Sequence, residues 1–392
     1  MKQITIKKGK EISLIRRHPW LFSGAIATND SNAEAGEWVE VCDHHGKVLG
    51  CGHFDSGSIA VRMLSFEKAD PENPAFWHTK LMYAYRLRKN LQLPDAETSA
   101  FRLVHGEGDG LPGLIVDVYN QVAVMQAHSS GMHHDRIKIA AALMALPDQF
   151  ITAVYYKSTG TLPGPLRDAV PDGFLQGDAP SPALIKEYGI EFIVDWVKGQ
   201  KTGFFADQRE NRKILSQYAR NKKVLNTFCY SGSFSMCALT GGAELVHSVD
   251  ASSHAIQLTE QLISQETFQT KHQAFVSDAF TFIEKSETSY DLIILDPPAF
   301  AKHKSARHNA IKGYQRLNKL ALQKIAKGGI LFTFSCSQVI DRQLFYDTVA
   351  SAAIIANRRV RVLHHLSQGP DHPVSMYHPE GEYLKGLVLE VE

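Results

Sequence analysis

A cysteine and an aspartate directly follow two apolar runs of the chain, where their side chains could take part in chemistry. Cys336 comes after GGILFTF in the stretch TFSCSQV, and Asp296 comes after YDLIIL and opens the stretch DPPAF. A buried cysteine can pack as a small hydrophobic residue, but ligands of parallel sheets bind at the carboxyl ends of the strands. The position of Cys336 therefore favours a chemical role, in which its thiolate is a nucleophile.

A thiol beside DPPAF favours methyl transfer to carbon 5 of a pyrimidine base. Carbon 5 is too weak a nucleophile to take a methyl group directly, so a thiolate first adds at carbon 6 and makes carbon 5 enamine-like. Methylation of a base amino group needs no thiol. Two prolines stiffen the turn so that Asp296 can face a planar ring, and a protonated Asp296 would donate to ring N3. A rigid turn without a base contact is the structural alternative.

Three successive strand ends carry polar residues that suit a nucleoside cofactor without phosphates. The first is NTFCYSGSFS, with Gly232 in a turn before a helix, and the second is ELVHSVD, ending at Asp250, eighteen positions after Gly232. An acidic residue at that spacing accepts hydrogen bonds from ribose hydroxyls. The third, SDAF, places Asp278 near the adenine amino group. The turn is not GxGxxG, and GKS and GKT are absent, which favours S-adenosylmethionine (SAM) over NAD or a triphosphate.

The segment KTGFFADQRENR precedes the first of these strands. Asp207 is expected to cap a helix, with Glu210 completing a capping box. Capping does not explain the other aromatic and polar residues of the segment, which are expected to close over the methionine end of the cofactor. The residues expected to bind the cofactor are Phe204, Phe205, Gln208, Arg209, Asn226, Phe228, Tyr230, Ser231, Gly232, Asp250, Ala251, Asp278, Ala279, Asp296 and Pro297.

Basic residues follow DPPAF in the stretch AKHKSARHN, whose cations have no acidic sequence neighbours. Beside a base pocket, such cations favour contact with phosphates over a merely solvated loop. Other basic groups are Lys7 to Arg17 and Arg358 to Arg361. The residues expected to contact RNA are Pro298, Phe300, Lys302, Lys304, Arg307, Arg16 and Arg17.

The elements that must position these residues change in character along the chain. Residues 1–72 carry the short runs QITIKK, EWVEVCD, VLGCGHF and IAVRMLSF, which predict a small β-barrel domain. Residues 73–188 predict a small α+β domain, with a helix over AFWHTKLMYAYRLRKNL, a hairpin within HGEGDGLPGLIVDVYNQVAVMQAH and a helix near Asp135 to Leu146. Residues 189–392 alternate strands with helices, which predicts an α/β fold with a parallel sheet covered on both faces.

Composition narrows the class of protein further. No apolar run approaches the roughly eighteen residues of a membrane helix, and the start MKQITIKKGKEIS lacks the apolar core of a signal peptide, so we expect a cytoplasmic protein. The net charge of +1 means that contact with nucleic acid must come from local basic patches. The five cysteines lack CxxC spacing, so we expect reduced thiols and no metal: Cys42, Cys51, Cys229, Cys237 and Cys336.

Taken together, these motifs resemble the bacterial 23S rRNA cytosine-C5 methyltransferases of the large-subunit methyltransferase I type. HPWLFSGAI resembles the start of their PUA RNA-binding domain, and five later stretches match their methyltransferase motifs in order: KTGFFADQRENR, VLNTFCYSGSFS, LDPPAF, GGILFTFSCS and DHPVSMYHPEGEYLKG. The resemblance implies a PUA domain, a small α+β central domain and a class I (Rossmann-like) methyltransferase domain that uses SAM, often assembled as a homodimer. It implies that Cys336 is the nucleophile and that Asp296 contacts the base.

Three other functions stay open at this stage. A uridine C5 methyltransferase would use the same thiol addition. A methyltransferase acting on base amino groups would use DPPAF and leave Cys336 structural. An RNA-binding or ribosome-assembly factor would keep the fold without catalysis.

Overall fold

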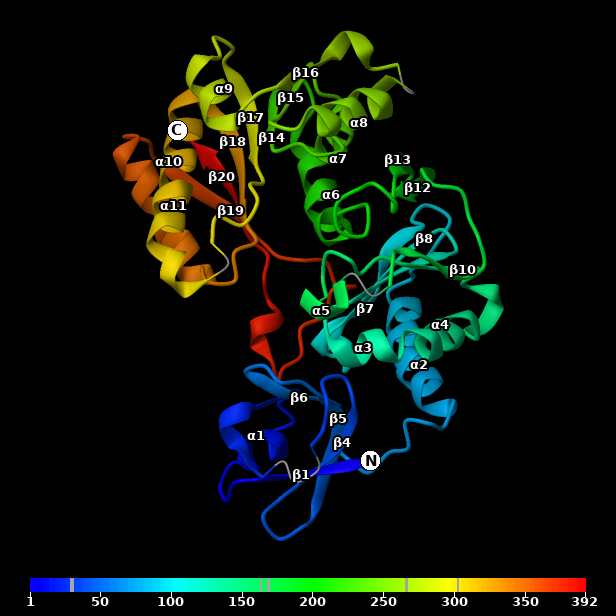
Figure 1. Ribbon diagram of the computed structural model, residues 1–392. Helices are drawn as coiled ribbons and strands as arrows, with labels where there is room; N and C mark the ends of the chain where they lie inside the picture. Colours follow the sequence, from blue (N-terminus) through cyan, green and yellow to red (C-terminus); the bar gives the residue numbers. More distant parts are fainter. Residues whose placement is uncertain (29–31, 163, 168–169, 265–266, 302) are drawn as a thin grey trace. The chain divides into compact units, whose positions relative to one another are not determined.

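The computed structural model describes the chain except residues 29–31, 163, 168–169, 265–266 and 302, and it divides into two compact units (Figure 1). Unit 1 consists of Met1–Lys186, Val194–Ala206 and Pro370–Gly381, and unit 2 consists of Glu187–Ile193, Asp207–Gly369 and Glu382–Glu392. Each unit is therefore built from segments that are far apart in the sequence. The expected division into three domains at residues 72 and 188 stays a prediction.

The first sheet of unit 1 has six strands in the order β2-β6-β5-β4-β1-β3. In β1, Ile4 and Ile6 are buried two positions apart, as the period of two in a strand requires. They pack with Val39 and Val41 in one apolar cluster. All four runs expected as strands are confirmed, and closure into a barrel stays a prediction. The strands are β1 (Lys2–Ile6), β2 (Trp20–Phe22), β3 (Ile26–Thr28), β4 (Trp38–Cys42), β5 (Val48–Phe54) and β6 (Ile59–Ser65).

The second sheet of unit 1 has five strands in the order β11-β10-β9-β8-β7, and two helices pack against it. The expected hairpin forms from β8 and β9, which pair antiparallel. Both expected helices form, as α2 (Ala75–Asn90) and α4 (Arg136–Met144). Trp77 of α2 and Ile139 of α4 join Val116 of β8 in one core. The strands are β7 (Ala100–His105), β8 (Leu114–Tyr119), β9 (Val122–Ala127), β10 (Ala153–Tyr156) and β11 (Gly173–Gln176).

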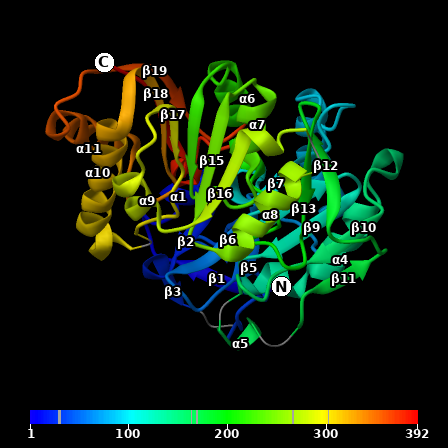
Figure 2. The ribbon, with the colours of Figure 1, turned by 90° about the horizontal axis from the view of Figure 1, so that it is seen from above.

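Unit 2 is a seven-stranded sheet in the order β16-β15-β14-β17-β18-β20-β19. Figures 1 and 2 both show α6, α7 and α8 on one face and α9, α10 and α11 on the other. The expected parallel sheet needs one correction, because β20 runs antiparallel to both β18 and β19. The strands are β14 (Lys223–Thr227), β15 (Leu245–Asp250), β16 (His272–Val276), β17 (Tyr290–Leu295), β18 (Ile325–Ser335), β19 (Val360–Leu366) and β20 (Lys385–Val391).

The helices of unit 2 follow the apolar pattern of the sequence. They are α6 (Arg209–Tyr218), α7 (Ser233–Thr240), α8 (Ser253–Ser264), α9 (Ala279–Lys285), α10 (Arg307–Lys324) and α11 (Arg342–Ile355). None of the described helices in either unit is long and apolar enough to cross a membrane.

Short elements of both units complete the described secondary structure. They are α1 (Ile12–Ile15), α3 (Ser130–His134), α5 (Gly164–Arg167), β12 (Ala183–Glu187), β13 (Ile190–Val194), η1 (Ser23–Ala25), η2 (Gly106–Asp109), η3 (Pro147–Gln149), η4 (Ala206–Gln208), η5 (Gln269–Lys271), η6 (Lys304–Ala306) and η7 (Pro379–Gly381).

A buried arginine ties the late segment Pro370–Gly381 to the rest of unit 1. The Arg88 side chain is fully buried and donates to both carboxylate oxygens of Asp109, to the carbonyl of Arg102 at 2.8 Å and to the carbonyl of Asp371 at 2.7 Å. The Asp371 carboxylate in turn accepts from the Arg102 backbone N–H at 2.9 Å. The turn DHP is thus held within unit 1 by buried charged groups.

Candidate active site

The strand order of unit 2 reverses between β14 and β17, which makes their carboxyl ends the expected ligand site of an open α/β sheet. Thr227 at the end of β14 pairs with Leu295 of β17, and Leu295 pairs with Thr333 of β18. This register brings the segments that follow the three strands to one edge of the sheet. They are the turn after Thr227, the stretch DPPAF and the segment that contains Cys336.

Cys336 lies against the DPPAF turn. It directly follows the last residue of β18, is half-buried, and its thiol donates to the Pro297 carbonyl at 4.0 Å. The other four cysteines are all buried. Burial raises the pKa of Cys229 to about 12 and also raises the pKa of Cys237, which keeps both thiols protonated. Cys336 is therefore the cysteine of unit 2 whose position suits a thiolate nucleophile.

Asp296 is held by a short chain of amide groups. The side-chain amide of Gln208 donates to Asp296 Oδ2 at 3.0 Å, and Asn211 donates to the Gln208 side-chain oxygen at 2.6 Å. Because Asn211 also donates to the Ser367 carbonyl, its position fixes which way the Gln208 amide points. The segment around Gln208 and the DPPAF turn, expected separately from the sequence, thus meet at this carboxylate.

The turn after β14 has a strained backbone. Phe228, Tyr230 and Gly232 all have positive φ angles, of 56°, 48° and 75°. Glycine adopts such angles freely, and a Cβ on Gly232 would lie 2.6 Å from the Thr259 side chain. A left-handed conformation costs a bulky residue such as Phe228 on the order of 1–3 kcal/mol, and such strain collects at ligand sites.

Asp250 braces this turn from the end of β15. Its carboxylate accepts from the Tyr230 backbone N–H at 3.1 Å and from the Ser252 backbone N–H at 2.9 Å. Each carboxylate oxygen can accept more than one hydrogen bond, so the group keeps capacity for ribose hydroxyls. Ala251, next in sequence, is exposed.

The remaining expected cofactor residues of unit 2 lie on the same strand ends. Asn226 is fully buried and donates to Ser235 of α7 at 2.8 Å, while Ser231 is buried within the turn. Asp278 is exposed and caps α9 by accepting from the Thr281 N–H at 2.9 Å, and Ala279 is buried in the first turn of that helix. Asp278 thus has a structural task that the sequence did not predict. Its contact with adenine stays a prediction.

The expected capping box at Asp207 and Glu210 is wrong. Helix α6 begins at Arg209 after the short helix η4, and its N-cap residue, Gln208, makes no side-chain capping bond. The two carboxylates have other partners, because Tyr383 donates to Asp207 at 2.6 Å and Tyr188 donates to Glu210 at 2.7 Å. Tyrosine hydroxyls from distant segments thus donate to both carboxylates.

The segment KTGFFADQRENR spans the division between the units. Phe204, which is buried, and Phe205, whose ring lies 4.5 Å from the Lys201 ammonium, belong to unit 1. Gln208 and Arg209, both buried, belong to unit 2. Closure of all four residues over one cofactor therefore stays a prediction.

The residues expected to contact RNA have varied surroundings. Pro298 and Lys304 are exposed, whereas the Phe300 ring packs against Tyr314 of α10, with 4.6 Å between ring centroids. Arg307 has an acidic neighbour in space, since it lies 3.7 Å from Asp341, but both side chains are exposed and such a pair is weak. Lys302 lies outside the described residues. Arg16 and Arg17 are exposed after helix α1 in unit 1.

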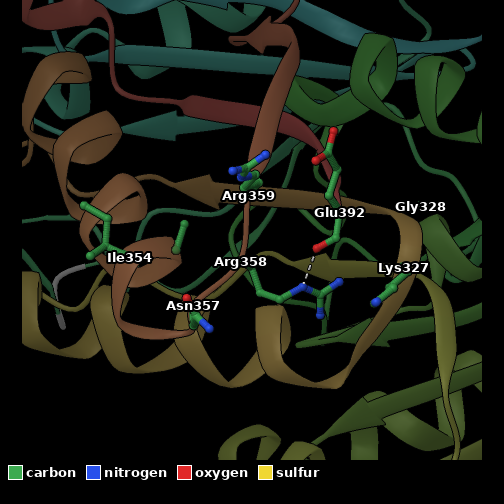
Figure 3. Close-up of a pocket in the computed structure, with 8 residues that line it drawn as sticks. Lys327, Gly328, Ile354, Asn357, Arg358, Arg359 and Glu392 are labelled. Carbon is green, nitrogen blue, oxygen red and sulfur yellow. Dashed lines mark hydrogen bonds between the residues drawn. The ribbon is translucent and has the colours of Figure 1, made fainter.

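A pocket at the opposite end of β18 is lined by Arg358 and Arg359 of the last basic group noted in the sequence (Figure 3). It is lined by Lys327 and Gly328 near the start of β18, roughly 25 Å along the strand from Cys336. Arg358 there donates to the carbonyls of Glu392, Leu322 and Ile325. Arg361 pairs with Glu390 and Glu392. Arg358 and Arg361 thus have partners within the protein.

Sequence reasoning missed two polar residues of this site, Asn211 and Lys385. Asn211 fits the pattern of a polar residue in an amphipathic helix, so the sequence gives no sign of its contact with Gln208. Lys385 is buried and donates to the carbonyl of Ser337, next to Cys336, at 2.8 Å. A lysine that opens the apolar run GLVLEV was the available signal.

Comparison with known proteins defines the class to which the fold and site belong. The S-adenosylmethionine-dependent methyltransferase family matches residues 166–375, more than half of the chain, and the PUA-like domain family matches residues 4–66. The molecule is therefore a SAM-dependent methyltransferase with an N-terminal PUA-like domain. Among solved structures, a candidate SAM-dependent methyltransferase from Streptococcus mutans has the same fold, with a TM-score of 0.84 at 24% identity over 100% of both chains.

Curated relatives extend the match over the whole length. Proteins named ribosomal RNA large subunit methyltransferase I are 37% identical over 397 residues in Escherichia coli O139:H28 and 38% identical over 395 residues in Alteromonas mediterranea. These alignments cover 99% of this chain and 99% and 98% of the relatives. The chain belongs to the ribosomal RNA large subunit methyltransferase I family.

Proposed function

We propose that this protein methylates carbon 5 of a cytidine in 23S rRNA through a covalent bond between Cys336 and carbon 6 of the base. The contact between the Cys336 thiol and the Pro297 carbonyl carries the proposal, because it supports a reaction between this thiol and a base held by the DPPAF turn. The names of the curated relatives support ribosomal RNA as the substrate. The half-buried position of Cys336 supports its access to a base.

The residues at the edge of the sheet fit SAM as the methyl donor. The strained turn from Phe228 to Gly232 and the Asp250 carboxylate would hold its adenosyl part, with Asp278 near the adenine. Bound SAM supplies an electrophilic methyl group on its sulfonium. The roles of individual residues in cofactor binding are part of the proposal.

The chemistry of the base then follows from the residues of the chain. The Cys336 thiolate adds to carbon 6, which moves electron density to carbon 5 and to ring N3. Asp296, held by Gln208, contacts the N3 side of the ring and donates a proton as charge develops there. After the methyl group has bonded to carbon 5, the carbon-5 proton passes to solvent and its electron pair re-forms the double bond between carbons 5 and 6. The thiolate then leaves carbon 6, and ring N3 returns its proton to Asp296. Cys336 is thus regenerated as a thiolate at the end of the reaction.

Mass spectrometry of ribosomal RNA tests the proposal most directly. Ribosomal RNA from cells lacking this protein is expected to lack one 5-methylcytidine that returns when the wild-type gene is supplied. A change confined to 5-methyluridine, or to a methylated base amino group, would contradict the proposal and identify the alternative. Calorimetric titration with SAM distinguishes a methyltransferase from a non-catalytic RNA-binding factor, because only the methyltransferase is expected to bind SAM.

The basic residues after DPPAF are expected to hold RNA phosphates. Substitution of Lys304 and Arg307 by alanine should weaken RNA binding and make the plot of log affinity against log salt shallower by about 0.7 for each lost contact. The matched control is Lys327→Ala with Arg359→Ala, because these exposed cations line the pocket at the other end of β18. Equal salt slopes for the wild type and the Lys304/Arg307 variant would show that these two side chains do not contact RNA phosphates. A triple variant that includes Lys302 extends the test to the whole stretch.

The cytoplasmic location and the homodimer are also proposals, supported by the family resemblance. A dimer would give twice the chain mass of 43.6 kDa in light scattering.

A further inference from the structure

A buried lysine lies at the end of the strand that pairs with the strand of Cys336. Lys385 opens β20, and its pairing with Ser335 places it across from the last residue of β18. Its side chain is buried, with 3% of the residue exposed. Lysine is almost never buried to this extent unless its charge is compensated, so its position calls for a reason.

Two backbone carbonyls fix the position of the Lys385 ammonium. Nζ donates to the Ser337 carbonyl at 2.8 Å and to the Tyr383 carbonyl at 2.7 Å. An ammonium group has three N–H donors, so two are used by these contacts within the described residues. The Ser337 carbonyl belongs to the residue that follows Cys336, so the cation is anchored to the segment that carries the thiol.

The electrostatics of Lys385 couple it to Cys336. Burial lowers the pKa of Lys385 to about 8, and the strongest influence in the opposite direction is Cys336, ahead of Glu382. The other charged groups that face Lys385 come from the start of α11: Arg342, which lowers its pKa, and Asp341, which raises it. Tyr314 of α10 also interacts with Cys336, since burial and, to a smaller extent, Cys336 raise the pKa of that tyrosine. Below about pH 8, Lys385 is thus a buried ammonium that interacts electrostatically with Cys336.

We propose that the Lys385 ammonium stabilises the thiolate of Cys336 and so prepares it for attack on the base. Lys385 is then a positioning residue, since it acts through Cys336 and its ammonium is held by backbone carbonyls. This inference rests on the proposed function for its catalytic meaning. The ion pair itself can be measured without methyl transfer.

Alkylation of Cys336 over a range of pH tests the pair in the full-length protein. Iodoacetamide reacts with thiolates, so the rate at which the Cys336 peptide gains mass reports the fraction of thiolate. In the wild type, the midpoint is expected below the ordinary cysteine value of about 8.5. In Lys385→Met it should rise by about one pH unit or more, as for loss of a close opposite charge. Lys385→Arg should keep the midpoint near that of the wild type, and the exposed-site control Lys327→Met should not move it.

Two features keep this test decisive. Cys229 and Cys237 are buried, so their alkylation would reveal a variant that fails to fold. The wild-type midpoint needs no variant, and a value at or above about 8.5 would overturn the inference, as would an unchanged midpoint in folded Lys385→Met. If Cys336→Ala keeps its activity while the midpoint still depends on Lys385, the proposed function fails and the ion pair stands.

Discussion

Substitution of Cys336 by alanine is expected to reduce methyl transfer to RNA by at least about a thousandfold. Without the thiol, no bond to carbon 6 can form, and carbon 5 stays too weakly nucleophilic to take the methyl group. Removal of a nucleophile commonly costs several powers of ten in rate. Transfer of a labelled methyl group from SAM to RNA measures the loss. Affinity for SAM, measured by calorimetry, should stay within about twofold, since Cys336 contacts the base in this mechanism.

The control for this substitution is Cys42→Ala, which removes a buried thiol from the first sheet of unit 1. It should keep its activity. RNA that carries 5-fluorocytidine at the target adds a second readout, because fluorine at carbon 5 cannot leave as a proton does. Wild-type protein should then stay bonded to the RNA, and Cys336→Ala should not. Full activity of Cys336→Ala would leave methylation of a base amino group as the function of the site.

Substitution of Arg88 by methionine is expected to lower the free energy of unfolding of unit 1 by about 3–5 kcal/mol. The Arg88 guanidinium is fully buried, and its loss leaves the buried Asp109 carboxylate without its cation and the Asp371 carbonyl without its donor. A charge left uncompensated in the interior carries a cost of this size. Urea denaturation followed by tryptophan fluorescence measures the change, because Trp77 and Trp38 belong to unit 1.

Two further variants distinguish a loss of charge balance from a loss of packing. The neighbouring exposed substitution Lys89→Met should change the unfolding free energy by less than about 0.5 kcal/mol. The double variant Arg88→Met/Asp109→Asn should recover part of the loss, because it removes the uncompensated charge as well. A single variant as stable as the wild type would show that the segment Pro370–Gly381 is held by other contacts.

Much of the fold could be predicted because its signals are local. The helices over SHAIQLTEQLIS and AFTFIEK, and the strands of β14, β15 and β17, follow from runs of apolar residues with the right period. The edge of the sheet that carries Cys336 and DPPAF also follows, because parallel strands place their carboxyl ends together. The turn at Gly232 is predictable for the same local reason.

The features that escaped prediction depend on residues far apart in the chain. The pattern at Asp207 and Glu210 is a valid capping signal, but in the folded protein helix α6 begins at Arg209. The hydroxyl groups of Tyr383 and Tyr188 donate hydrogen bonds to the two carboxylates. The meeting of Gln208 with Asp296 joins residues 88 positions apart. The placement of Lys385 across from Ser335, at the end of β18, depends on β20 running antiparallel next to β18, which no short stretch of sequence encodes.

The interleaving of the two units sets the order in which the protein can be completed during synthesis. Unit 1 begins at Met1 but needs Pro370–Gly381, and the sheet of unit 2 receives β20 only after Lys385 has been added. Unit 1 is not whole until the ribosome has added Gly381, and unit 2 is not whole until it has added β20. In a nascent chain stopped at residue 186, Arg88 and Arg102 would lack their contacts with Asp371. Such a fragment is expected to fold incompletely and to be cleaved readily by proteases.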